Sequence, residues 1–108
     1  NSKDKNGGKI MAKLEMNNYV EVLNAKKWEA NAKGWLYIEV NAKELNEEVE
    51  AGVKNLTPAC KAMLDVMLEG DYFVVEPKSR SKVAGALTVR YYCDNLSPER
   101  RKYSEVNA

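Results

Sequence analysis

The fold is decided by residues 35–92, which read WLYIEVNAKELNEEVEAGVKNLTPACKAMLDVMLEGDYFVVEPKSRSKVAGALTVRYY. The aromatic and β-branched side chains at 35–40 predict a strand. After it we expect a short helix between Asn41 and Gly52, a tight turn, a second helix and a basic hairpin. Each of these elements has its own sequence signals.

The second helix has the clearest boundaries. We expect Thr57 to be its N-cap, Pro58 its first helical residue, and Gly70 the C′ residue that ends it in a left-handed conformation. Apolar side chains recur at spacings of three and four and predict one buried face: Cys60, Met63, Leu64, Met67 and Leu68.

The first helix of the pair begins with a variant of the capping box, in which Asn41 is followed by Glu44. Gly52 supplies its stop. Only residues 53–56 then separate this glycine from Thr57. A turn of this length joins the two helices of a helix-turn-helix unit.

The hairpin is predicted from two strand patterns. Residues 72–75 are aromatic and β-branched, and residues 87–92 alternate with a period of two. Between them, residues 76–86 contain a proline, a glycine, serines and three cations, so we expect an exposed and positively charged loop. Arg90 lies on the strand face opposite the apolar set, from which it is expected to reach DNA or to pair with Glu76.

This order of elements resembles the winged helix-turn-helix superfamily over about half of the chain. The stretches LTPACKAM, EGDYFVVEPKS and LTVRYYC also resemble a group of small bacterial proteins. The resemblance implies an α+β winged helix with a three-helix core, a small antiparallel sheet and a basic wing hairpin. It carries over eight pattern positions without a catalytic role: Pro58, Cys60, Gly70, Asp71, Pro77, Lys78, Arg90 and Tyr91.

We expect one domain at residues 14–93, because 108 residues suffice for a single modest core. Residues 1–13 are predicted to be a disordered segment or tag, and residues 94–108 a tail with a short basic helix. Residues 14–32 are predicted to form the first helix, although residues 19–22 could instead start a strand. Its expected apolar stripe is Met16, Tyr19, Val20, Leu23 and either Lys27 or Trp28.

The charge is small overall but unevenly distributed. The formal net charge is +1, yet residues 78–102 carry +5 and residues 14–52 carry −4. The basic part could contact phosphates, or the charges could simply solvate both faces of an ordinary domain. No apolar run is long enough to span a bilayer, and the sequence predicts a cytoplasmic protein without membrane contact.

Catalysis is not expected from this composition. The chain has no histidine, which excludes the usual imidazole base and the nucleophile pairs that depend on it. Cys60 and Cys93 lack the spacing of a metal or redox motif and are expected to be free thiols, although one bridge between them is possible. We therefore predict no enzyme activity, no metal and no cofactor.

The predicted function is binding of duplex DNA, mainly through phosphates, by a small bacterial or mobile-element regulator or accessory protein. The side chains on the exposed face of the second helix, Lys61, Ala62, Asp65, Val66 and Glu69, depart from the usual set of base readers. The residues expected to contact DNA are Lys54, Asn55, Lys61, Lys78, Arg80, Lys82 and Arg90.

The alternative is a protein-interaction module on the same scaffold that does not bind DNA. Its acidic first helix of the pair and a strip formed by Ala62 and Val66 would then meet a partner. The three cations of the hairpin loop would in that case only keep the hairpin soluble. A homodimer through the N-terminal helix or the tail is also possible. The large aromatic side chains are expected in the core and not on a base-stacking surface: Trp28, Trp35, Tyr37 and Phe73.

Overall fold

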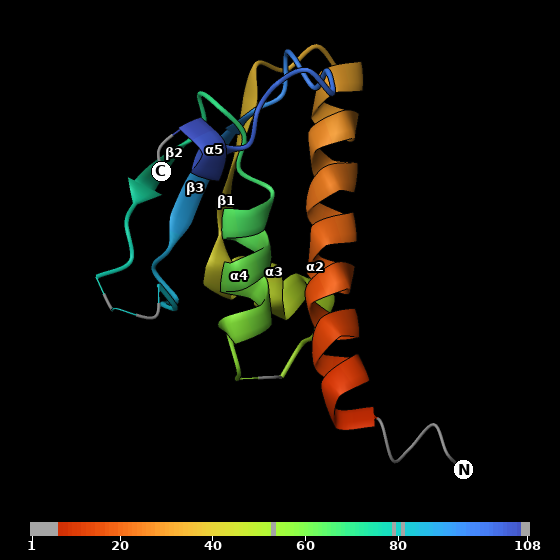
Figure 1. Cartoon of the computed structure of the whole chain (residues 1–108), viewed down its shortest axis with the longest axis vertical. Helices are drawn as coiled ribbons and strands as arrows, with labels where there is room; N and C mark the ends of the chain where they lie inside the picture. The colour runs from red at the N-terminus through yellow and green to blue at the C-terminus, as the bar shows by residue number, and fades with distance from the viewer. Residues whose placement is uncertain (1–6, 53, 79, 81, 107–108) are drawn as a thin grey trace.

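A computed structural model describes residues 7–52, 54–78, 80 and 82–106, with side chains from Met16 onward (Figure 1). The prediction of an α+β fold is confirmed. The elements are α2 (Gly7–Ala32), β1 (Tyr37–Asn41), α3 (Ala42–Val49), α4 (Thr57–Asp65), β2 (Tyr72–Val75), β3 (Thr88–Tyr92) and α5 (Tyr103–Val106).

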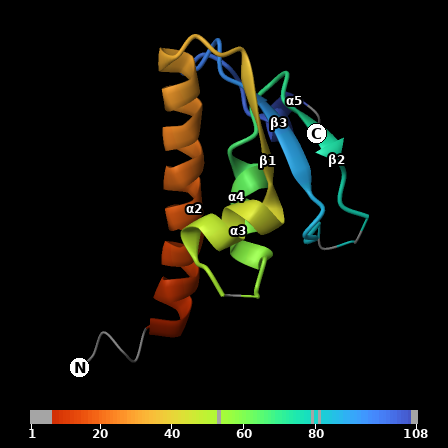
Figure 2. The same cartoon turned by 180° about the vertical axis from the view of Figure 1, so that it is seen from behind.

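The three strands form one antiparallel sheet in the order β1-β3-β2. Val89 in the central strand lies opposite Val40 of β1 and Phe73 of β2. The helices α2, α3 and α4 lie together beside this sheet (Figures 1 and 2). The core between helices and sheet contains Tyr19, Leu23, Leu45, Cys60, Met63, Leu87, Val89 and Tyr91.

Helix α2 is longer than the sequence predicted. It begins at Gly7, ahead of the expected boundary at residue 14, and reaches into the segment that was expected to be disordered. Residues 1–6 lie outside the described part of the chain. Residues 19–22 are helical and do not form a strand, and Tyr19 and Leu23 are buried as the stripe predicted.

Helix α3 confirms the predicted cap. The side chain of Asn41 accepts a hydrogen bond from the backbone N–H of Glu44 at 3.0 Å. Its Nδ2 also donates to the backbone oxygen of Gly85 at 3.0 Å and to Thr88 Oγ1 at 3.2 Å. One side chain therefore starts α3 and joins it to the base of the β2–β3 hairpin.

Both predicted ends of α4 are wrong. Leu56 is the N-cap and has no side-chain cap, while Thr57 is the first helical residue. The helix ends at Asp65 and not near Gly70. Gly70 does have a positive φ of 95°, but it lies in the turn that precedes β2. Met67 is still buried, although it lies beyond the helix.

Tertiary hydrogen bonds explain why α4 stops early. The backbone N–H of Tyr103 donates to the oxygen of Met67 at 2.9 Å, and the N–H of Glu69 donates to the oxygen of Arg101 at 2.8 Å. Residues 67–69 thus pair with the C-terminal segment, and this pairing outweighs the local helical preference. The basic tail helix was misplaced for the same reason, because Arg100, Arg101 and Lys102 precede α5.

The predicted aromatic core is wrong for three of its four members. Trp28, Trp35 and Tyr37 are 57%, 53% and 40% exposed. Trp28 lies on the side of α2 opposite the buried stripe. The last position of the stripe, for which the sequence allowed Lys27 or Trp28, is occupied by the buried Lys27. Phe73 is half-buried and packs edge-on against Tyr103 with ring centroids 5.9 Å apart.

Candidate nucleic-acid interface

Three segments distant in sequence meet at one end of the molecule: the start of α3, the turn before α4 and the β2–β3 loop. A Cβ atom placed on Gly85 of the loop would lie 3.5 Å from Leu56 Cδ1 and 3.8 Å from Lys43 Cβ. Cys60 Sγ donates to the oxygen of Ala84 at 3.6 Å. The base of the loop is therefore packed on the first turn of α4, and the two segments project from a common edge.

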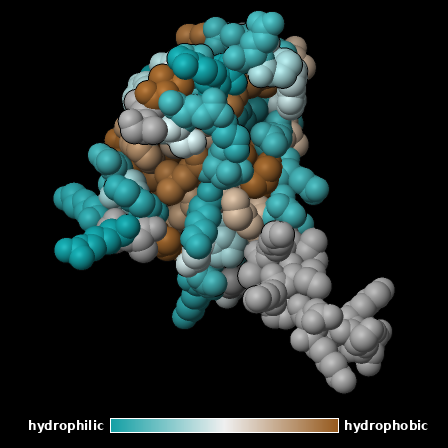
Figure 3. Space-filling model, viewed as in Figure 1, coloured by the Kyte–Doolittle hydropathy of each residue, from teal (hydrophilic) through white to brown (hydrophobic). Residues whose placement is uncertain are grey.

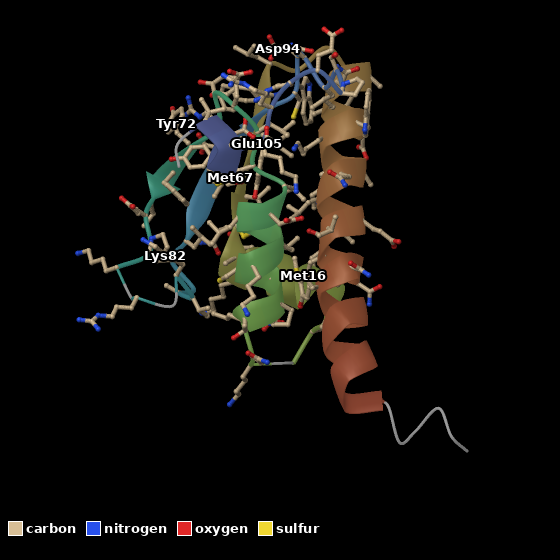
Figure 4. All side chains as sticks on the ribbon, viewed as in Figure 1. Met16, Met67, Tyr72, Lys82, Asp94 and Glu105 are labelled. Atoms are coloured by element: carbon tan, nitrogen blue, oxygen red, sulfur yellow. The ribbon has the colours of Figure 1, made fainter. Side chains whose placement is uncertain are left out.

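This edge carries cations that have no ion-pair partner. Among the side chains that the structure describes, six exposed cations make no ion pair, and all six belong to α3, the turn, α4 or the β2–β3 loop: Lys43, Lys54, Lys61, Lys78, Arg80 and Lys82. Figure 4 shows Lys82 on the loop, well away from Asp94. Hydrophilic side chains extend from the β2–β3 loop in the space-filling view (Figure 3). We call these six residues the cationic edge.

The other cations from Met16 onward are paired or buried. Lys26, Lys33, Arg100, Arg101 and Lys102 each lie within 4 Å of a carboxylate oxygen. Lys27 is buried, and its Nζ donates to the backbone oxygen of Val66 at 2.9 Å. The cationic edge is thus where charge is left free for a ligand.

Arg90 does not belong to the cationic edge. The expected pairing with Glu76 is wrong, because Arg90 Nε donates to Glu39 Oε2 of the neighbouring strand at 2.8 Å. This hydrogen bond raises the pKa of the guanidinium above its usual value. The guanidinium also stacks between two rings, 4.1 Å from the centroid of Tyr37 and 5.3 Å from that of Tyr72. Arg90 therefore organises the outer face of the sheet.

The structure changes the predicted set of DNA-contacting residues at two positions: Asn55 is engaged in the turn, and Lys43 joins the set. Asn55 Oδ1 accepts a hydrogen bond from the N–H of Thr57 at 3.1 Å, so its oxygen serves the turn. Lys43 was not predicted, since it lies in the first turn of an otherwise acidic helix. Only the packing of Gly85 on α3 brings it beside the loop.

Helix α4 presents few side chains for reading bases. Lys61 and Asp65 are exposed, and Thr57, Pro58 and Leu64 are half-buried. Ala62 and Val66 are buried, so the exposed strip that was predicted from them is wrong. They are buried because α4 packs closely on α2, where Lys27 reaches the oxygen of Val66. Contacts at this edge would therefore fall mainly on phosphates.

No group of three or more histidine, cysteine, aspartate or glutamate side chains that could hold a metal ion occurs among the described residues. Over the same residues, no helix is both long and apolar enough to cross a bilayer. Cys60 and Cys93 are both free and buried, so the possible bridge between them is absent.

Comparison of the chain with models of known protein families, with curated proteins and with solved structures finds no match.

Proposed function

We propose that this chain is a winged helix protein that binds duplex DNA without catalysis. The element order supports the assignment, because a winged helix has one helix, a strand, a helix pair and then a hairpin. The strand order β1-β3-β2 supports it too, since it places the hairpin strands beside the strand that precedes the helix pair. In this assignment α4 is the recognition helix and residues 76–87 are the wing.

The observation that carries the proposal is the cationic edge. Its side chains are exposed and form no ion pair with a carboxylate in the described chain. Lysine and arginine that neutralise phosphates release condensed counterions, and this release supplies most of the sequence-independent affinity for DNA. The scarcity of base readers on α4 favours binding with little sequence preference. A small regulator or accessory protein of bacterial or mobile-element DNA fits this behaviour.

The test compares two variants that remove equal charge. The loop variant carries Lys78→Ala, Arg80→Ala and Lys82→Ala. The control variant carries Lys33→Ala, Arg101→Ala and Lys102→Ala, which also removes two lysines and one arginine, but from ion-paired positions. Binding is measured by fluorescence anisotropy on a random duplex of about 20 base pairs at about 50 mM salt.

We expect the loop variant to bind at least about tenfold more weakly than the wild type and the control variant to bind within about twofold of it. Equal losses in the two variants would show that net charge alone governs binding. Absence of binding by the wild type at low salt would also refute the proposal.

A further inference from the structure

A groove of about 290 Å³ lies between α2, β1 and α3. It shares only the start of α3 with the proposed DNA surface. One wall consists of four consecutive residues of β1, 38–41. In a strand, successive side chains point to opposite faces. Four consecutive lining residues therefore mean that the backbone edge of the strand faces the groove.

Among the described residues, no strand lies beside that edge of β1. In the order β1-β3-β2, β1 pairs on one side only. The N–H of Cys93 donates to the oxygen of Leu36 at 2.8 Å, and the N–H of Ala42 donates to the oxygen of Leu87 at 2.9 Å. Because hydrogen-bonded pairs alternate in an antiparallel ladder, the even-numbered residues of β1 bond to β3.

The backbone groups of the odd-numbered residues of β1 consequently point away from β3. Glu39 is the odd-numbered residue in the middle of the groove wall. In the described part of the chain, its N–H and C=O form no hydrogen bond with another residue. A free donor and acceptor at a strand edge can pair with an extended chain.

The other walls determine which chain would fit. They carry the carboxylates of Glu29, Glu44 and Glu48 but only one cation, Lys26. Lys26 pairs with Glu48 at 2.9 Å and Lys33 pairs with Glu29 at 2.8 Å, whereas Glu44 makes no ion pair within the described residues. Trp35, which is 53% exposed, adds an indole wall, and Lys33 Nζ already lies 4.8 Å from the centroid of its ring. The unpaired carboxylate of Glu44 therefore repels nucleic acid and attracts a cation.

The geometry points to a docking site for an extended basic segment of a partner protein. The segment adds to the sheet as a fourth strand beside β1 and places a lysine or arginine near Glu44. The groove shares only the start of α3 with the cationic edge, where Lys43 precedes Glu44, and the rest of its lining comes from α2, Trp35, β1 and the end of α3.

The test uses the full chain and a blocked six-residue peptide in which threonine alternates with arginine. A matched peptide has glutamate in place of arginine. Amide hydrogen exchange followed by NMR is the readout. We expect the Glu39 amide to exchange quickly in the free protein and slowly with the basic peptide, while the Val40 amide is protected in both states.

Two variants then test the charge. Glu44→Gln is expected to weaken binding of the basic peptide about two- to fivefold, whereas Glu105→Gln, which changes a glutamate on α5, leaves it unchanged. An unprotected Glu39 amide, equal binding of the acidic peptide, or equal effects of the two variants would each overturn the proposal.

Discussion

The carboxylate of Asp71 and the guanidinium of Arg100 form a buried ion pair, with Oδ1 2.6 Å from Nη2 and side chains that are 0% and 6% exposed. Asp71 also accepts hydrogen bonds from the N–H groups of Leu68 and Tyr92, each at 2.8 Å. Arg100 donates to the oxygen of Glu69 at 2.8 Å. The pair therefore joins the turn after α4, strand β3 and the C-terminal segment.

Breaking this pair should be costly, because Arg100→Ala leaves the Asp71 carboxylate buried without its partner. We expect a loss of about 3–5 kcal/mol in the free energy of unfolding, measured by urea denaturation. The control is Arg101→Ala, since the Arg101–Glu69 pair is exposed and 3.5 Å apart. That variant should lose at most about 1 kcal/mol. Similar losses in both would contradict the role given to the buried pair.

Lys27 should make stability rise with pH. Burial lowers the pKa of its ammonium from 10.5; the nearby Asp71 opposes this shift and Arg100 adds to it. Between the lowered pKa and 10.5, the unfolded chain binds more protons at this site than the folded chain, so the free energy of unfolding increases with pH.

The comparison with Lys27→Met isolates this contribution, because the other titrating groups are common to both proteins. Urea denaturation at about pH 7 and about pH 10 should show the wild type gaining stability relative to the variant. A difference that is independent of pH would show that Lys27 keeps its ordinary pKa in the folded state.

Local signals in the sequence predicted the fold where local forces decide it. The cap at Asn41 and the alternation that buries Leu87, Val89 and Tyr91 are short-range patterns, and the structure confirms both. The end of α4 could not be predicted in this way. It depends on hydrogen bonds between residues 67–69 and the C-terminal segment, which is distant in sequence.

The candidate site was predicted only in part for a similar reason. The sequence shows which cations exist, but it cannot show which of them carboxylates neutralise. Glu39 of the neighbouring strand pairs with Arg90, and the packing of Gly85 brings Lys43 beside the loop. The register of the sheet places Glu39 opposite Arg90, and the packing of the loop on α3 and α4 places Lys43 beside it.

Asn41→Ala should destabilise the protein by about 1–2 kcal/mol, because it removes the cap of α3. The same change breaks the hydrogen bond to the oxygen of Gly85 that anchors the loop. Asn18→Ala, an exposed change within α2, should stay within about 0.5 kcal/mol of the wild type. If thermal denaturation shows no difference between the two variants, the anchoring role of Asn41 is wrong.

The thiols of Cys60 and Cys93 should be inert in the folded protein. Both are fully buried, and burial raises the pKa of each thiol. Since the thiolate is the reactive form, a thiol reagent at about pH 8 should label the native protein far more slowly than the protein in denaturant. Native labelling at the denatured rate would mean that these side chains reach solvent.

The dependence of DNA affinity on salt tests the central claim most directly. Each neutralised phosphate contributes about 0.9 to the slope of log affinity against log salt concentration. We expect a slope of about −5 for the wild type, and a slope shallower by about 2.5 for the loop variant, with the control variant unchanged. A loop variant that keeps the slope of the wild type would show that the cationic edge does not contact DNA.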